Sequence, residues 1–227
     1  MPTVDISILI PCFDKEQYID ECIESISQQT VKPREIILAH DGCTEPMAHA
    51  KATTIIFNSN RGVSKVRDEL VRFSRGQLLL FLDADDKLAP DYLEKMVNLI
   101  TKVDIVYPNI FWWYGNKWGD NRLDEAPEKI VPKDFFHTCK IPITCLMKKD
   151  VYTKLGGFRD FEKYEDWDFW LRALVEGFKF KKANTMLYYR QYPESRNRIG
   201  DKDKKRSIYH KIISQYELKR GKICLKN

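Results

Sequence analysis

Three carboxylates stand within four residues in the motif Asp83-Ala84-Asp85-Asp86. The motif directly follows the apolar run at residues 78–82, whose lack of alternation predicts a strand buried on both faces. Ligands of open parallel sheets bind beyond the carboxyl ends of the strands. Neighbouring carboxylates repel one another unless a cation lies between them, and Mg²⁺ or Mn²⁺ commonly shares such oxygens with substrate phosphates. The motif therefore predicts a divalent-cation site; a solvated acidic turn is the alternative.

Two further polar clusters follow apolar runs. Asp41-Gly42 comes after residues 36–39, where a carboxylate can accept a hydrogen bond from a base or a ribose and glycine permits a tight turn. Arg61 and Arg67 come after residues 54–57, and cations near a helix start there suit a diphosphate. An ordinary turn and a solvated helical face are the alternatives. Three polar strand ends facing one crevice favour a binding site.

An acidic pair, Glu165-Asp166, stands at the start of a predicted helix. The helix dipole favours an ionised Asp166, which can then remove a proton from an attacking hydroxyl as a general base. The alternative is a helix-terminal charge with no catalytic role.

Alternating apolar runs and amphipathic segments predict the elements that must position these groups, in an α/β fold with a parallel sheet. Strands are expected at residues 5–10, 35–39, 54–57, 77–82, 104–107 and 144–147. Helices are expected at residues 15–29, 63–74, 90–100, 149–155 and 165–176, and an amphipathic basic segment at 203–218.

Length and charge predict one domain with a basic tail. A chain of 227 residues fits a single domain over residues 1–200, with a nucleotide-binding half at 1–107 and an acceptor half at 108–200. Residues 201–227 form the tail and carry a net charge of +6, whereas the whole chain carries +5. The body is therefore almost neutral, which argues against a nucleic-acid-binding surface.

The six cysteines form no C-x-x-C pair, so reduced thiols and a cytoplasmic location are expected. No apolar run approaches the roughly 20 residues that span a bilayer, and no signal peptide is recognisable. The tail has one apolar face among basic residues. It either contacts an anionic membrane surface or packs on the protein's own domain.

Several motifs in order resemble glycosyltransferase family 2, over roughly residues 4–192. They are the segment 7–14, Asp41-Gly42, Asn60-Arg61-Gly62, the segment 81–86, Gly156-Gly157-Phe158 and the segment 165–170. The resemblance implies a GT-A fold, with a Rossmann-like, mostly parallel central sheet flanked by helices and a smaller acceptor-side portion. It also implies inverting transfer of a sugar from a nucleotide-sugar donor, expected to be a UDP-sugar, to a glycan or glycolipid hydroxyl.

The resemblance assigns roles to particular residues. The donor-binding set is Pro11, Phe13, Asp41, Arg61, Arg67 and Asp83. Asp85, with Asp83, is expected to bind Mn²⁺ or Mg²⁺, and Asp166 to be the base with Glu165 beside it. The acceptor-binding set is Trp112, Trp113, Gly157 and Trp167. For the two adjacent tryptophans, packing within an irregular flap is the alternative to a platform under a sugar.

The sequence departs from the family pattern at four positions. His40 stands in place of an Asp, Cys43 in place of a frequent Ser, and Asp68 in place of a common Asn. Tyr192 stands where a metal-ligating His often occurs. His40 and Tyr192 leave open a nucleotide-sugar-binding protein without turnover, although both Asp85 and Asp166 are retained.

Overall fold

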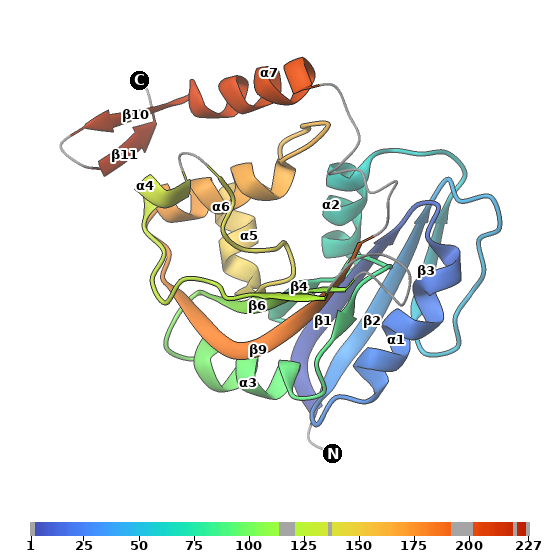
Figure 1. Ribbon diagram of the computed structural model, residues 1–227. Helices are drawn as coiled ribbons and strands as arrows, with labels where there is room; N and C mark the ends of the chain where they lie inside the picture. Colours follow the sequence, from blue (N-terminus) through green and yellow to red (C-terminus); the bar gives the residue numbers. More distant parts are fainter. Residues whose placement is uncertain (1–2, 114–120, 136–137, 192–201, 220–221, 226–227) are drawn as a thin grey trace.

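The computed structural model describes residues 3–113, 121–135, 138–191, 202–219 and 222–225 (Figure 1). Its first half is a parallel sheet in the strand order β3-β2-β1-β4. The strands are β1 (Thr3–Cys12), β2 (Lys32–Asp41), β3 (Thr53–Phe57) and β4 (Leu78–Phe81). The helices here are η1 (Glu16–Tyr18), α1 (Ile19–Ser27), α2 (Val63–Phe73) and α3 (Tyr92–Ile100). All carboxyl ends of these strands therefore meet at one edge.

The second half continues the same sheet in mixed directions, in the order β4-β8-β6-β9-β5 with β7 on β6. Strands β6 and β9 are parallel, whereas β8, β7 and β5 pair antiparallel with their neighbours. The strands are β5 (Lys87–Leu88), β6 (Ile105–Trp113), β7 (Arg122–Asp124), β8 (Leu146–Lys148) and β9 (Phe180–Arg190). The helices are α4 (Pro132–Phe135), α5 (Lys149–Leu155) and α6 (Glu165–Val175). The predicted α/β fold, a central sheet flanked by helices, is confirmed.

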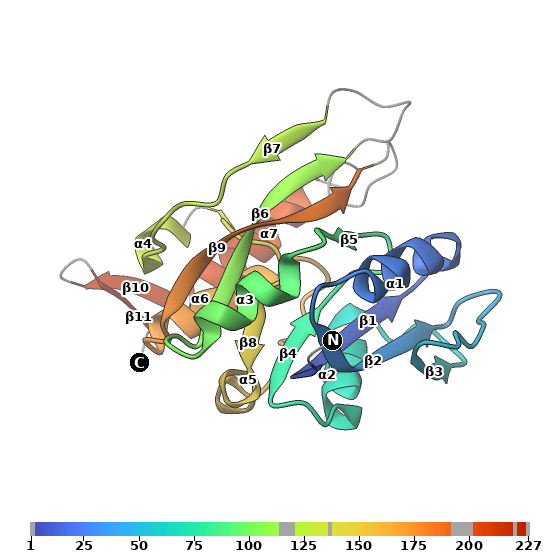
Figure 2. The ribbon, with the colours of Figure 1, turned by 90° about the horizontal axis from the view of Figure 1, so that it is seen from below.

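Two apolar cores lie on the two faces of the sheet, and β4 supplies both because its side chains alternate. Leu79 and Phe81 pack in the core beneath α2, α5 and α6, whereas Leu80 packs in the core beneath α1 and α3. Figure 2 shows α1 and α3 on the same face of the sheet. Burial on both faces explains the uninterrupted apolar run of this strand.

Two segments differ from the sequence-based expectation. Residues 111–113 continue strand β6 instead of forming an irregular flap. Strand β9 was not predicted because lysines and tyrosines interrupt its apolar pattern, although Ala183, Thr185 and Leu187 alternate toward the interior. Pairing with β6 and packing against α3 bury this strand, although its composition does not predict burial.

The tail packs on the domain. It forms α7 (Lys202–Ile213) followed by a hairpin of β10 (Tyr216–Lys219) and β11 (Lys222–Leu225). Ile212 is fully buried and Tyr216 is 2% exposed, both in the core beneath α6. The ring of Tyr209 stacks on Trp167 at 5.2 Å. Of the two expectations for the apolar face, packing on the domain is therefore the one observed. Among the described residues, no helix has the length and apolarity to cross a bilayer.

Ile212→Ala should lower the free energy of unfolding by about 2–5 kcal/mol, because it empties a buried site between α7 and the core. Urea unfolding followed by circular dichroism measures this change. Arg206→Ala, at an exposed position of the same helix, is the control and should change stability by less than about 0.5 kcal/mol. Equal stability of the two variants would show that α7 does not belong to the cooperative unit.

Candidate active site

The turn after β2 is organised by Asp41, which is only 3% exposed. Its carboxylate accepts hydrogen bonds from the backbone N–H groups of Arg61, at 2.7 Å, and Gly62, at 3.1 Å. Gly42 follows with φ +72°, and a Cβ atom there would lie 2.4 Å from the backbone nitrogen of Asn60. Only glycine permits this approach. Asp41 and Gly42 thus hold the loop after β3 against the end of β2.

Three of the predicted donor-binding residues lie around this edge. Pro11 is the second-to-last residue of β1, and Phe13, just beyond that strand, is 46% exposed. An exposed aromatic ring at a strand end is available to a ligand. The Arg61 guanidinium lies 4.7 Å from the centroid of the Phe57 ring and 3.7 Å from Glu69. The structure brings these residues to the same strand ends as Asp41.

The turn at residues 83–86 places its three carboxylates in different surroundings. The Asp86 N–H donates to the Asp83 carbonyl at 3.0 Å, which closes the turn. Asp86 is 2% exposed, and burial, followed by the charges of Asp85 and Asp83, raises its pKa well above its usual value. Asp83 and Asp85 remain partly exposed. The turn therefore presents two carboxylates and holds the third inside.

The turn suits a divalent cation. Its negative potential reaches the neighbouring Cys22 thiol, whose pKa is raised by burial and then by Asp86, Asp85 and Asp83. A set of hard oxygen donors is what Mg²⁺ and Mn²⁺ favour. Only two of the carboxylates are exposed, so a bound ion would take its remaining ligands from diphosphate oxygens and water.

Arg67 joins the two acidic motifs. Its buried guanidinium donates to Asp83 Oδ1 at 3.0 Å and to Glu165 Oε1 at 2.8 Å. It also lies 5.5 Å from the centroid of the Phe158 ring. Asp83 and Glu165, which are far apart in sequence, are thereby held by the two terminal nitrogens of one guanidinium. The described contacts of Arg67, which the sequence assigned to donor binding, are with these protein groups.

Asp166 lies in the first turn of α6, two residues after Tyr164, whose φ of 67° is unusual for a residue other than glycine. Its Oδ1 accepts the Trp167 N–H at 2.8 Å. Burial, followed by the Glu165 charge, raises the pKa of Asp166 to about 7, while Arg67 opposes that rise. The helix dipole, which was expected from the sequence to favour the ionised form, is thus opposed by burial and by the Glu165 charge. A pKa near neutrality nevertheless suits a general base.

Arg190, at the end of β9, is a site residue that the sequence did not single out. Its N–H donates to Asp86 at 2.9 Å and its Nε to the Asp85 carbonyl at 3.0 Å. Its guanidinium reaches Glu21 at 2.7 Å and lies 4.1 Å from the centroid of the Trp113 ring. It thus clamps the acidic turn to the second half of the sheet. The neighbouring Tyr192 lies outside the described residues.

The predicted acceptor residues of β6 lie next to this clamp. The Nζ atom of Lys87 lies 3.7 Å from the centroid of the Trp113 ring. The ring therefore makes a cation–π contact and is not a purely apolar surface. Trp112 lies 5.0 Å from the Tyr189 ring, and its Nε1 donates to Asp124 at 3.3 Å. Both tryptophans are partly exposed. Trp113 therefore lies beside the Arg190 clamp, whereas the described contacts of Trp112 include Tyr189 and Asp124.

The other two predicted acceptor residues have described packing roles. A Cβ atom on Gly157 would lie 2.9 Å from Asp68 Oδ1 and 2.9 Å from the Tyr152 hydroxyl, so glycine permits the hydrogen bond between those groups. Trp167 is 3% exposed, and its Nε1 donates to the Phe135 carbonyl at 2.7 Å. Asp68, which replaces a common Asn, also accepts the Phe158 N–H at 3.2 Å.

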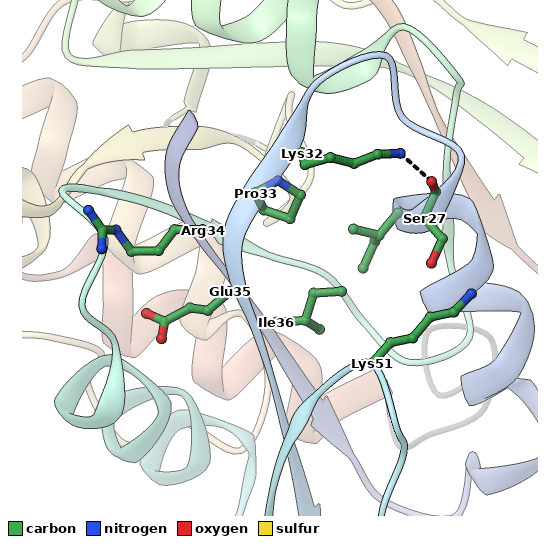
Figure 3. A pocket seen from close by; sticks show the side chains of 8 residues that line it. Ser27, Lys32, Pro33, Arg34, Glu35, Ile36 and Lys51 are labelled. Carbon is green, nitrogen blue, oxygen red and sulfur yellow. Dashed lines mark hydrogen bonds between the residues drawn. The ribbon is translucent and has the colours of Figure 1, made fainter. Parts of the chain in front are cut away.

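A hollow of about 350 Å³ lies elsewhere, at the amino end of β2 (Figure 3). Its three cations have protein partners. Lys32 donates to the Ser27 carbonyl, Arg34 pairs with Asp5, and Lys51 pairs with Glu24 at 2.8 Å. It lies at the opposite end of the strands from the acidic turn and forms no part of the site.

Comparison with known proteins identifies relatives over most of the chain. The sequence model described as "Glycosyl transferase family 2" matches residues 7–164. EpsH of Bacillus subtilis, whose name assigns it to the glycosyltransferases, is 33% identical over 105 residues, which are 43% of this chain and 30% of EpsH. An uncharacterized glycosyltransferase of Haemophilus influenzae is 28% identical over 86% of this chain and 71% of its own length.

Among solved structures, S. aureus TarS 1-349 in complex with UDP-GlcNAc has a TM-score of 0.71 at 16% identity. The match covers 94% of this chain and 66% of that chain. At this identity the likeness establishes a common fold.

Proposed function

Because the chain belongs to glycosyltransferase family 2, we propose that it transfers a sugar from a nucleotide-sugar donor, of the UDP-sugar class, to a hydroxyl group of a glycan or glycolipid. The observation that carries this proposal is the Arg67 bridge. It joins Asp83, at a strand end suited to a nucleotide, to Glu165, beside a carboxylate with a pKa near 7. The fold shared with TarS, solved with UDP-GlcNAc, supports the UDP-sugar class.

The donor side would be formed by the strand ends. Phe13 offers an exposed ring near Pro11 for the nucleoside, and Asp41 orders the loop that carries Arg61. Asp83 would contact the ribose. Asp85, with Asp83, would hold the divalent cation. When bound, Mn²⁺ or Mg²⁺ would neutralise the negative charge that develops on the leaving nucleoside diphosphate.

The acceptor side would be formed by α6 and β6. Asp166 would take the proton of the acceptor hydroxyl as its oxygen bonds to the anomeric carbon and the bond to the diphosphate breaks. One base and one displacement invert the anomeric configuration. Trp112 and Trp113, both partly exposed, would contact the acceptor sugar.

Asp85→Asn tests this function, because the amide removes a charged ligand while it keeps the size of the side chain. We expect the affinity for UDP in the presence of Mn²⁺ to fall at least tenfold, or about 1.4 kcal/mol, with little change in melting temperature. Calorimetric titration of UDP with and without Mn²⁺ measures this. Asp150→Asn, at an exposed position on α5, is the matched control. Unchanged Mn²⁺-dependent affinity in Asp85→Asn would contradict the assignment.

Asp41→Ala should weaken UDP binding by at least about tenfold, because two hydrogen bonds to a carboxylate, each worth about 1.5–3 kcal/mol, no longer order the loop at residues 60–62. Titration calorimetry with UDP measures the dissociation constant. Asp20→Ala, on the exposed side of α1, should leave it unchanged. If turnover falls and the dissociation constant does not, Asp41 has a different role.

A further inference from the structure

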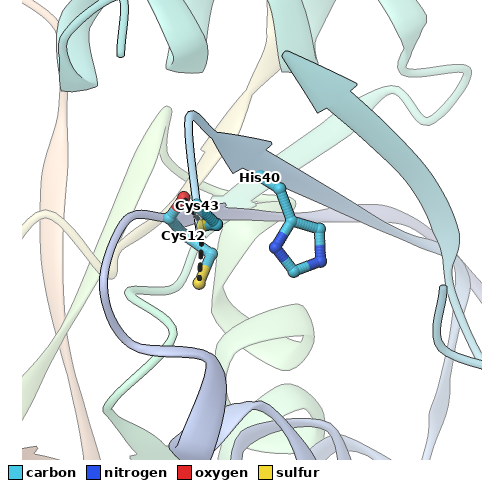
Figure 4. Close-up of side chains that lie close together, drawn as sticks. All are labelled: Cys12, His40 and Cys43. Atoms are coloured by element: carbon cyan, nitrogen blue, oxygen red, sulfur yellow. Dashed lines mark hydrogen bonds between the residues drawn. The ribbon is translucent and has the colours of Figure 1, made fainter. Parts of the chain in front are cut away.

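Three potential ligands of a soft metal lie together where β1 and β2 end (Figure 4). They are the Sγ atoms of Cys12 and Cys43 and a ring nitrogen of His40, all within 4.8 Å of one another. Cys12 and His40 are register partners on the two parallel strands, and Cys43 is on the turn that follows β2. Among the described residues, no other group of three such side chains is this close.

The burial and hydrogen bonding of His40 provide a second observation that points to a metal ligand. It is fully buried, its Nε2 lies 3.0 Å from the Met47 carbonyl oxygen, and its Nδ1 has no hydrogen-bond partner. A carbonyl only accepts, so Nε2 carries the proton and Nδ1 presents a lone pair. Figure 4 shows one ring nitrogen on the side of the two thiols and the other turned away. A histidine that ligates a metal typically donates its other N–H to such a carbonyl.

The spacing of the sulfurs fits metal coordination. The two Sγ atoms are 3.9 Å apart. Two thiolates bound to one tetrahedral Zn²⁺ at about 2.3 Å lie about 3.8 Å from each other. A disulfide instead requires about 2.05 Å. Small side-chain movements therefore suffice to place one ion between the three groups, whereas a disulfide needs a much larger approach.

We propose that Cys12, His40 and Cys43 bind one thiophilic transition-metal ion of the Zn²⁺ class. The two thiols would give their protons to solvent and ligate as thiolates, and His40 would ligate through neutral Nδ1. Cys43, partly exposed, is on the open side, where a water or a further ligand completes the shell. This soft S₂N set differs from the hard oxygen set at Asp85, and the argument for it does not depend on the proposed transferase activity.

Cobalt titration tests the site in the full chain, kept reduced with a phosphine. Co²⁺ bound by thiolates has a near-ultraviolet charge-transfer band, which oxygen ligands do not produce. We expect one equivalent of Co²⁺ to generate this band and one equivalent of Zn²⁺ to remove it. No band in the folded, reduced protein would overturn the proposal without any variant.

Variants assign the ligands. Cys43→Ser, at the partly exposed position, should weaken Zn²⁺ binding by more than the roughly 10–100-fold cost of losing an outer-shell partner, and should reduce the band. Cys145→Ser is the matched control, because that buried thiol donates to the Pro142 carbonyl away from the cluster. Asp85→Asn should retain the band. A band of undiminished intensity in Cys43→Ser, or its disappearance in Asp85→Asn, would refute the assignment.

Discussion

Asp166→Asn should lower the rate of sugar transfer by about 10²–10⁴-fold, with donor affinity nearly unchanged. The amide keeps the shape of the side chain but cannot accept a proton. The carboxylate is in the first turn of a helix anchored by buried Phe169 and Trp170, so its position should survive the substitution. Steady-state kinetics with a saturating donor, together with UDP calorimetry, separate the two quantities.

Glu165→Gln is the matched comparison, because it removes the adjacent charge and leaves Asp166 in place. Glu165 pairs with Arg67 and is 12% exposed, so its loss should affect the positioning of the site more than the proton transfer itself. Near-normal turnover in Asp166→Asn with collapse in Glu165→Gln would reverse the two roles.

The pH profile gives a second readout of Asp166. Because its pKa is raised to about 7, the ionised base becomes scarce below neutrality, and the wild-type rate should fall about tenfold per pH unit there. The same raised pKa means that the folded protein holds this proton more tightly than the unfolded chain. Stability should therefore fall as pH rises from about 4 to about 7. Both effects should be absent from Asp166→Asn.

Arg67→Met should lower the free energy of unfolding by about 3–5 kcal/mol, because it removes one partner from a buried charge network and leaves Asp83 and Glu165 uncompensated. Urea unfolding measures the loss. Arg72→Met, on the exposed side of the same helix, should change stability by less than about 0.5 kcal/mol. Comparable, small changes in the two variants would show that the bridge contributes little.

Arg67 should also influence catalysis through Asp166. Its charge opposes the rise of the Asp166 pKa, so a variant without that charge should have its rate decline begin at a higher pH. Arg67→Lys retains the charge but lacks the planar fork that reaches two carboxylates, and its profile should lie closer to that of the wild type. An unchanged pH–rate profile in Arg67→Met would show that the Arg67 charge does not influence the pKa of Asp166.

Local patterns in the sequence predicted the parallel half of the sheet. The apolar run before Asp83 and the short runs before Asp41 and Asn58 are each long enough to form a strand, and each ends at a polar group. Helices α2, α5 and α6 were predicted to within a residue or two because their 3.6-residue periodicity and their ends are encoded locally. The acidic motifs were visible for the same reason.

Tertiary structure decided which of these groups meet. Arg67 looked like one more cation at a helix start, and only the packing of α6 beside α2 makes it the bridge between Asp83 and Glu165. The pKa of Asp166 likewise depends on burial and on charges from other elements. Strand β9 contains many polar residues, and its pairing with the parallel strand β6 is what makes it part of the sheet. Periodicity reports the faces of one element, whereas burial and electrostatic potential sum over all elements around a site, so these features arose only with the assembled fold.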